Sequence, residues 1–233
     1  ITTTGADMTF DMPACATDGV RFLINGEEQP VLTSGSYSFT NLEPGTVYTI
    51  HLYSLCGDGD TSYATTAQFM TECVNITLPY LFDFEGDHAN CYNYEHMYWR
   101  TEASNAHSGN IAFYSSGSTG HYVVTPVIEA PEDADGNIVF EFYALPLNST
   151  YYGTDVTFKL YVSTEASLEF DSTFSVVMDT AISGNDYMSI KLNLAPYAGQ
   201  NITIAIENTT NGSPYLFIDD IAVRSTLAPV VTL

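Results

Sequence analysis

Apolar and polar residues alternate along most of this chain, and no long stretch shows the 3.6-residue period of an amphipathic helix. Alternation places every second side chain on the buried face of a β-strand. The clearest alternating sets are Ile138/Phe140/Phe142, Val156/Phe158/Leu160/Val162, Phe174/Val176/Met178 and Ile202/Ile204/Ile206. Turn-forming clusters rich in Gly, Asn and Asp separate these sets. The pattern predicts an all-β chain with one or two sandwich or jelly-roll domains.

Two segments combine this alternation with carboxylates. They are Leu78–Cys91, which reads LPYLFDFEGDHANC, and Tyr215–Val223, which reads YLFIDDIAV. A strand that buries one face can present oxygen ligands from its other positions. We therefore expect an acidic strand to open a domain, a second acidic strand to close it, and calcium to join the two.

The composition argues against a nucleic-acid partner. The chain has 28 Asp and Glu against 5 Lys and Arg, which gives a formal charge of −23. Nucleic acid and anionic membranes are bound by clustered Lys and Arg, and this chain lacks such clusters. A simpler role for most of the carboxylates is to keep a surface rich in Tyr and Phe soluble.

Neither the apolar runs nor the ends of the chain predict membrane insertion. No run approaches the roughly 18 apolar residues needed to span a bilayer, and the first ten residues lack the regions of a signal peptide. Because the chain does not begin with Met, we expect it to be part of a longer multidomain chain. Residues 227–233 are predicted to be a linker to a further region.

The N-terminal part carries a motif of one known family. Residues 37–56 contain the pattern Leu42-x-Pro44-Gly45-Thr46-x-Tyr48, followed by an alternating strand. This run resembles the E strand, the E–F corner and the F strand of a fibronectin type III domain. The resemblance implies an immunoglobulin-like sandwich over residues 1–73, in which the hydroxyl of Tyr48 ties down the corner.

The rest of the chain, residues 74–226, resembles a second family through an ordered set of motifs. These motifs are Leu78-Pro79, Asp83-Phe84-Glu85, Cys91, Trp99, His107-Ser108-Gly109-Asn110, Thr125-Pro126-Val127-Ile128 and Phe217-Ile218-Asp219-Asp220-Ile221. Together they resemble a MAM-like jelly roll, closest to the cleaved-adhesin domains of Bacteroides-type bacterial surface proteins. Carbohydrate-binding jelly rolls are also similar. The fold class expected is therefore all-β, with a fibronectin-like sandwich followed by a larger jelly roll.

The second resemblance implies a structural calcium ion, which prefers six to eight oxygen ligands. Glu85 and Asp219 would be its main carboxylates, and carbonyl oxygens of the turn from Ser108 to Asn110 would add to them. Asp83 is a weaker candidate. Asp220 ranks below Asp219, because alternation places Asp219 on the face of Phe217, Ile221 and Val223, which we expect to be buried. Alternatively, Glu85 and Asp219 only accept backbone hydrogen bonds.

Four cysteines without any C-x-x-C pair suit disulfides better than zinc, which indicates an oxidising compartment. Four cysteines allow three pairings. With the strands assigned as above, we select Cys15 with Cys56 in the first domain. Cys73 with Cys91 would then join the linker to the opening strand of the second.

No catalytic motif is present, and the five histidines are scattered, so we do not expect an enzyme. The 17 tyrosines favour binding, since Tyr brings a large rigid surface with a polar tip. Tyr151 and Tyr152, in a loop, are the candidate ligand-binding residues. The favoured function is a non-catalytic adhesion module, secreted or at the cell surface, that binds glycan or an extracellular protein. The alternative is a spacer or accessory module of a larger exported hydrolase or protease.

Overall fold

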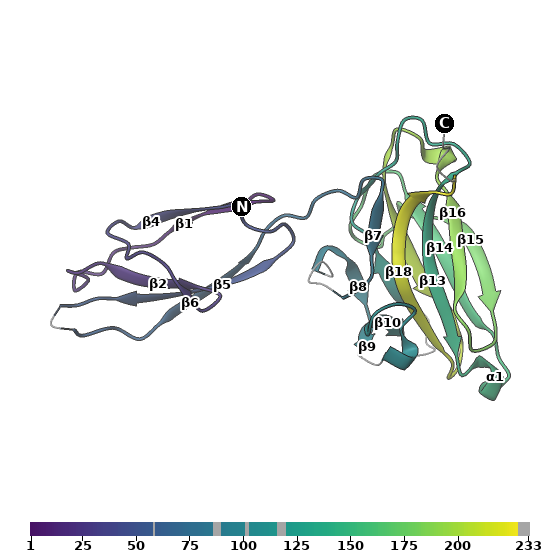
Figure 1. Ribbon diagram of the computed structural model, residues 1–233, viewed down its shortest axis with the longest axis horizontal. Helices are drawn as coiled ribbons and strands as arrows, with labels where there is room; N and C mark the ends of the chain where they lie inside the picture. The colour runs from purple at the N-terminus through teal and green to yellow at the C-terminus, as the bar shows by residue number, and fades with distance from the viewer. Residues whose placement is uncertain (58, 86–89, 101–102, 116–119, 228–233) are drawn as a thin grey trace, which may run out of the picture. The chain divides into compact units, whose positions relative to one another are not determined.

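A computed structural model describes residues 1–57, 59–85, 90–100, 103–115 and 120–227. The chain forms two compact units, Ile1–Val74 and Asn75–Leu233 (Figure 1). Strands dominate both units, which confirms the all-β prediction. No helix in the described ranges has the length and apolar character needed to cross a membrane. The predicted linker, residues 227–233, lies outside the described residues from position 228 onward.

The first unit contains two antiparallel sheets. Its strands are β1 (Gly5–Thr9), β2 (Val20–Ile24), β3 (Glu27–Glu28), β4 (Ser36–Thr40), β5 (Val47–Ser54) and β6 (Thr65–Met70). β1 pairs with β4, and the other sheet has the order β3-β2-β5-β6. Their inward faces enclose a core that contains Phe22, Phe39 and Ile50. Small as this unit is, it has an apolar core of its own.

The corner before β5 has the contact that the sequence motif predicts. The hydroxyl of Tyr48 accepts a hydrogen bond of 2.9 Å from the backbone N–H of Glu43. The ring of Tyr48 also stacks on Phe69 of β6, with 5.5 Å between ring centroids. One side chain therefore fixes both the turn and the neighbouring strand.

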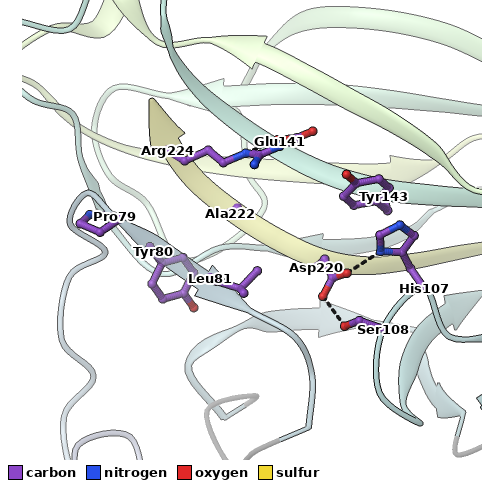
Figure 2. Close-up of a pocket in the computed structure, with 10 residues that line it drawn as sticks. All are labelled: Pro79, Tyr80, Leu81, His107, Ser108, Glu141, Tyr143, Asp220, Ala222 and Arg224. Atoms are coloured by element: carbon purple, nitrogen blue, oxygen red, sulfur yellow. Dashed lines mark hydrogen bonds and ion pairs between the residues drawn. The ribbon is translucent and has the colours of Figure 1, made fainter. Parts of the chain in front are cut away.

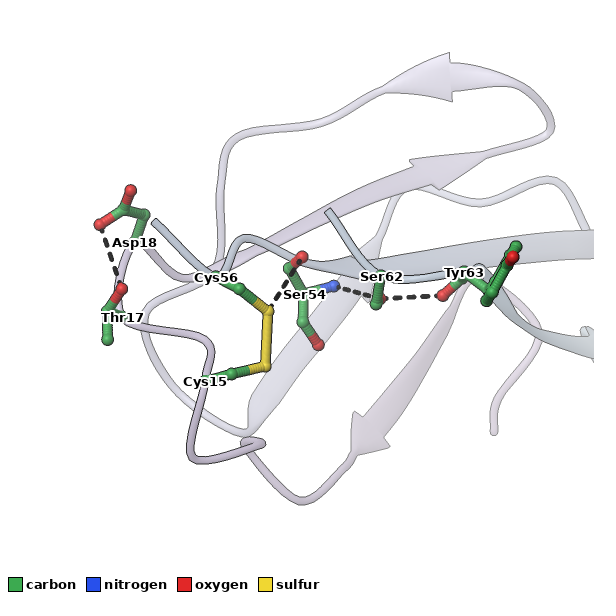
Figure 3. Close-up of a disulfide and its surroundings, with 7 residues drawn as sticks. All are labelled: Cys15, Thr17, Asp18, Ser54, Cys56, Ser62 and Tyr63. Carbon is green, nitrogen blue, oxygen red and sulfur yellow. Dashed lines mark hydrogen bonds between the residues drawn. A yellow bond between two sulfur atoms is a disulfide. The ribbon is translucent and has the colours of Figure 1, made fainter. Parts of the chain in front are cut away.

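The structure contains the predicted disulfide between Cys15 and Cys56 (Figure 3). It joins the loop after β1 to the end of β5, with Cα atoms 4.7 Å apart. Cys73 and Cys91 are also disulfide-bonded, so none of the four cysteines is a free thiol. This supports the predicted oxidising compartment.

Replacing both Cys15 and Cys56 with Ser is expected to lower the unfolding free energy of the first unit by about 3–4 kcal/mol. The bond links residues 41 positions apart, so its loss frees the unfolded chain considerably. Urea titrations of the full chain, followed by a signal from the first unit, would measure the change. A single transition with an unchanged midpoint would contradict the prediction.

The second unit consists of two larger sheets. The front sheet has the order β16-β13-β18-β10-β9, with β7 paired to β18, and the back sheet has the order β15-β14-β17-β11-β8, with β12 paired to β17. The strands of the front sheet are β7 (Tyr80–Phe82), β9 (Tyr98–Arg100), β10 (Ala112–Ser115), β13 (Ile138–Leu147), β16 (Met188–Asn193) and β18 (Tyr215–Ser225). Those of the back sheet are β8 (Asn93–Glu95), β11 (His121–Val124), β12 (Ile128–Glu129), β14 (Val156–Ser163), β15 (Ser175–Ile182) and β17 (Asn201–Asn208). Short helical segments are α1 (Ser149–Tyr152), η2 (Ala103–Asn105) and η3 (Ala195–Tyr197).

The core of the second unit lies between these two sheets, which form packed layers in Figure 1. The alternating sets predicted in β14 and β17 and the two phenylalanines of β13 are buried there, as expected. The alternating set predicted for β15 is wrong at Val176, which was expected to be buried and is 52% exposed. The register between β14 and β15 shifts at Leu160/Tyr161, which leaves Val177 as an extra residue and reverses the faces beyond it. Met178 therefore packs against the core while Val176 faces solvent.

Candidate functional site

A bulge in β18 organises the acidic part of the candidate site. Glu141 of β13 is opposite Ala222, but Tyr143 is opposite Asp219. In the register, two residues of β18, Asp220 and Ile221, therefore lie opposite the single residue Phe142. Asp220 has a positive φ of 49°, a conformation that Asp tolerates better than most side chains. The extra residue allows two adjacent carboxylates to lie on the same face of the front sheet.

The predicted face of Asp219 is wrong for the same reason. Phe217 packs with Ala112 and Leu145 in a cluster of its own, on the outer face of the front sheet. Ile221 and Val223 point instead into the core between the sheets. The bulge lies between these residues, and because side chains alternate along a strand, one inserted residue exchanges the two faces.

Asp219 is completely buried under the loop that carries His107 and Ser108. Its Oδ2 accepts hydrogen bonds from the backbone N–H groups of His107 (2.7 Å) and Ser108 (3.2 Å), and its Oδ1 accepts one from Asp220 N–H (2.8 Å). Burial raises the pKa of Asp219 to about 6, and the charge of Asp220 adds to the rise, while the three N–H donors oppose it. The folded protein therefore holds this carboxylate ionised at neutral pH at a cost in stability.

Asp220 is tied to the side chains of the same loop. Its Oδ2 lies 2.5 Å from Nδ1 of His107, and its Oδ1 accepts a hydrogen bond of 2.7 Å from the hydroxyl of Ser108. Both partners thus bond to the carboxylate, and no hydrogen bond in the described structure joins Ser108 Oγ to His107. The nucleophile–base contact of a hydrolytic triad is therefore missing from this cluster.

Glu85 holds the other end of the same loop. Its Oε1 accepts hydrogen bonds from the N–H groups of Asn110 (2.6 Å) and Ile111 (2.5 Å), and these bonds lower its pKa. Gly109 has φ +59°, and a Cβ there would lie 2.5 Å from the carboxyl carbon of Glu85. The loop therefore wraps closely around this carboxylate. Asp83 Oδ1 in turn accepts a hydrogen bond from Glu85 N–H (3.2 Å).

Of the six predicted calcium ligands, Ser108 and Asn110 belong to the loop 107–111, and Glu85, Asp219 and Asp220 are bonded to it, whereas Asp83 contacts Glu85. The loop presents backbone N–H groups to Glu85 and Asp219. Backbone hydrogen bonds to Glu85 and Asp219 are what the alternative to calcium binding predicted for these two residues. In the described ranges, no three His, Cys, Asp or Glu side chains are grouped to hold a metal ion. The donor set still fits calcium chemically, since it consists of oxygen atoms and no lysine or arginine in the described chain pairs with Glu85, Asp219 or Asp220. A calcium ion would need carbonyl or hydroxyl oxygens besides the carboxylates.

A groove of about 590 Å³ lies beside this loop on the outer face of the front sheet (Figure 2). β7 forms one wall, and β18 and β13 form the floor and the other wall. Its lining residues are Pro79, Tyr80, Leu81, His107, Ser108, Glu141, Tyr143, Asp220, Ala222 and Arg224. Ala222 lies between Glu141 on β13 and Leu81 on β7, so its small side chain leaves the floor open.

Glu141 and Arg224 occupy one end of the groove. Glu141 is only 1% exposed, and its Oε2 accepts a hydrogen bond from Nε of Arg224 and forms an ion pair with Nη2. Its Oε1 accepts a hydrogen bond of 2.5 Å from the hydroxyl of Ser189 and lies 3.5 Å from Nζ of Lys191. Burial pushes the pKa of Glu141 upward, but Ser189, Arg224 and Lys191 outweigh it and hold the pKa below its usual value.

Aromatic rings form the other end of the groove. The rings of His107 and Tyr143 are stacked, with centroids 3.6 Å apart and planes 15° from parallel. Tyr187 contacts His107 edge-on and donates a hydrogen bond of 2.6 Å to the carbonyl of Asn105. The loop before β10 is therefore held against the outer face by stacking as well as by its hydrogen bonds to carboxylates.

The predicted ligand-binding tyrosines lie elsewhere. Tyr151 and Tyr152 belong to the short helix α1 and are 84% and 47% exposed. Their rings contact each other edge-on, with centroids 5.1 Å apart, and neither residue lines the groove. Their role in binding stays a prediction.

Sequence reasoning missed the residues at the Glu141 end of the groove. Alternation correctly places Glu141 opposite the buried phenylalanines, but it gives no sign that a groove lies there. A usable signal was the scarcity of cations: Lys191 and Arg224 are two of only five Lys and Arg. Their meeting at Glu141 depends on strand pairing, which the sequence pattern did not supply.

Comparisons with known proteins leave the family of the chain open. No protein-family model matches the chain, and no curated protein matches it. Among solved structures, the K2 cleaved adhesin domain of Lys-gingipain is 13% identical, covering 62% of this chain and 98% of that one, with a TM-score of 0.46. The K1 cleaved adhesin domain of Lys-gingipain from Porphyromonas gingivalis W83 is 14% identical, covering 64% and 90%, with a TM-score of 0.44. The tandem CBM22 domains of Paenibacillus barcinonensis Xyn10C are 11% identical, covering 98% and 80%, also at 0.44.

Proposed function

We propose that the second unit is a non-catalytic binding module, secreted or at the cell surface, whose groove takes a glycan. The observation that carries this proposal is the groove itself. Its volume of about 590 Å³ lies within the range of roughly 300–1,000 Å³ typical of small-molecule sites. It combines apolar and aromatic walls with a few fixed polar groups, which is the usual composition of such sites.

The chemistry of the two ends suits a sugar. The stacked rings of His107 and Tyr143 offer an aromatic surface, and the carboxylate of Asp220 and the guanidinium of Arg224 offer hydrogen-bond partners for hydroxyl groups. Several of these groups are held in place before any ligand arrives, because Asp220 is bonded to His107 and Ser108, and Arg224 to Glu141. Such preorganisation reduces the entropy lost on binding.

We further propose that calcium stabilises the loop 107–111 that borders the groove. Glu85 and Asp219 would be its carboxylate ligands, with oxygen atoms of Ser108 and Asn110 completing the site, and Asp83 and Asp220 nearby. When bound, the ion would neutralise carboxylates that have no cationic partner of their own. These residues would keep the loop in the position that shapes one end of the groove.

A second candidate partner is an extracellular protein, and the exposed rings of Tyr151 and Tyr152 favour it. Exposed tyrosines are typical of protein-binding surfaces. A screen of the purified chain against a glycan array and a panel of matrix proteins would separate the two partners. Tyr152→Ala should weaken the binding of a protein ligand and leave the binding of a glycan unchanged. Binding to neither panel would support the spacer alternative.

The variant Ala222→Phe is expected to reduce glycan affinity at least tenfold. The larger side chain would fill the floor of the groove between Glu141 and Leu81. Isothermal titration calorimetry with a glycan found in the array screen would measure the loss. The matched control is Val176→Phe, which adds a phenyl group at an exposed position of the back sheet. If both variants bind like the wild type, the groove is not the site.

A further inference from the structure

The described lysine and arginine side chains are paired with carboxylates in two different ways. Arg21 pairs with Glu28 at 2.9 Å, and Lys159 pairs with Asp179 at 3.3 Å, one cation to one carboxylate. At the groove, by contrast, Lys191 and Arg224 share the single carboxylate of Glu141. This end of the groove therefore has an excess of one positive charge in a chain whose formal charge is −23.

Arg224 lines the groove, Lys191 lies beside Glu141 on the neighbouring strand β16, and both cations have capacity for another anion. The side chains of Arg224 and Lys191 are 49% and 48% exposed, whereas Glu141 between them is 1% exposed. Arg224 uses Nε and Nη2 for Glu141, and Nη1 has no acceptor among the described residues. Glu141 thus anchors both cations and leaves the outer N–H groups of Arg224 to the groove.

The opposite end of the groove has the opposite character. Asp220 lies there, bonded to His107 and Ser108, with the buried carboxylate of Asp219 next to it. Figure 2 shows Arg224 and Glu141 toward one end and Asp220 with His107 toward the other, with Ala222 between them. A ligand in the groove would place an anionic group at the first end and neutral hydroxyl groups at the second.

On the basis of the glycan-binding function proposed above, we infer that the preferred glycan carries a uronic acid, whose carboxylate binds the outer N–H groups of Arg224 and is attracted by the charge of the neighbouring Lys191. The planar guanidinium of arginine matches a carboxylate in geometry, and hydrogen bonds between ionised partners are roughly twice as strong as neutral ones. Carboxylates elsewhere on the chain oppose this binding only where they lie within the screening length of the site. At physiological ionic strength, charges separated by more than about 8 Å in solvent are largely screened.

The test compares an acidic glycan with its uncharged methyl ester and with a sulfated glycan. Calorimetry with the full chain in about 0.15 M salt, where the Debye length is about 8 Å, would use tetragalacturonate, its methyl ester and a tetrasaccharide from κ-carrageenan, whose anionic groups are sulfates. We expect tetragalacturonate to bind at least tenfold more tightly than the ester and more tightly than the sulfated sugar. Because Lys191→Gln removes the excess positive charge but keeps Arg224, it should lower the affinity ratio between acid and ester toward one. The matched control, Lys159→Gln on the back sheet, should leave the ratio unchanged.

Each other result has a distinct meaning. Equal affinity for the acid and its ester would overturn this inference while leaving glycan binding intact. A preference for the acid that Lys191→Gln does not reduce would also overturn it. Tighter binding of the sulfated sugar would overturn the choice of a carboxylate. If none of these ligands binds and the glycan array is also silent, the proposed function itself fails.

Discussion

Chelation of calcium is expected to lower the melting temperature of the second unit by about 5–10 °C. This estimate takes calcium at about 100 times its dissociation constant, which adds about 2.7 kcal/mol, and a shift of about 2–4 °C per kcal/mol for a unit of this size. The physical reason lies in Asp219, which is fully buried beside a second carboxylate. Differential scanning calorimetry of the full chain in calcium and in EDTA would measure the shift.

The pH dependence of stability should differ between the calcium-free and the calcium-bound protein. Since the folded pKa of Asp219 is raised from 3.8 to about 6, this group favours folding when protonated, and that contribution is lost as the pH rises through about 6. The difference corresponds to about 3 kcal/mol. In EDTA the second unit should therefore become more stable as the pH falls from 7 toward 5. With calcium bound, protonation would compete with the ion and the gain should disappear.

Asp219→Asn is the matched variant for this experiment. The amide oxygen can still accept hydrogen bonds from the loop 107–111, but the charge is gone. The melting temperature of this variant should be the same in calcium and EDTA, whereas Asp179→Asn, at an exposed site of the back sheet, should keep the full difference. An unchanged wild-type melt in EDTA, together with no calcium by elemental analysis, would contradict the calcium proposal.

Replacing Arg224 with Met is expected to destabilise the second unit by about 2–3 kcal/mol at pH 7. Removing one partner of a buried ion pair typically costs about 3–5 kcal/mol, and the half-exposed position of Arg224 and the remaining contact with Lys191 reduce this figure. The variant would leave Glu141 charged and buried with only Ser189 and Lys191 as partners. Chemical denaturation at pH 7 would measure the loss.

The order of three variants tests that explanation. Glu141→Leu should lower the unfolding free energy less than Arg224→Met does, because the arginine that remains in the first variant can reach solvent, while the glutamate that remains in the second cannot. The double variant should be more stable than Arg224→Met alone, since no unpaired charge remains buried. The loss of unfolding free energy in Arg224→Met should also be smaller at about pH 4, because protonation of Glu141 in this variant removes its unpaired buried charge. Equal losses in all three variants would contradict the account.

Local patterns proved reliable where a strand is regular from end to end. The apolar alternation in β14 and β17 correctly identified their core faces, because the period of two needs no information from neighbouring strands. The corner at Tyr48 was equally accessible, since its hydrogen bond to Glu43 closes within five residues. In both cases the determining contacts lie within a short segment.

Alternation failed at the two bulges, in β15 and in β18. A bulge depends on how many residues each of two paired strands places between their shared hydrogen bonds, and this cannot be deduced from one strand alone. Strict alternation would place Asp219 and Asp220 on opposite faces of the sheet. Because of the bulge in β18, both carboxylates lie on the same face. The sequence pattern therefore identified the acidic strands but assigned Asp219 to the wrong face.

The sequence by itself determined that this chain is all-β, poor in cations, oxidised at its cysteines, and acidic in the two strands that meet at the candidate site. Those properties follow from residue types and short-range periodicity. Only the tertiary structure decided that Lys191 and Arg224 meet at Glu141 and that Glu141 and Arg224 line a groove, because antiparallel pairing of β13 with β16 and β18 brings together residues that are 50 and 83 positions apart. Ala222 became a groove floor by the same pairing. Its small side chain matters because the neighbouring strands place Glu141 and Leu81 on either side of it.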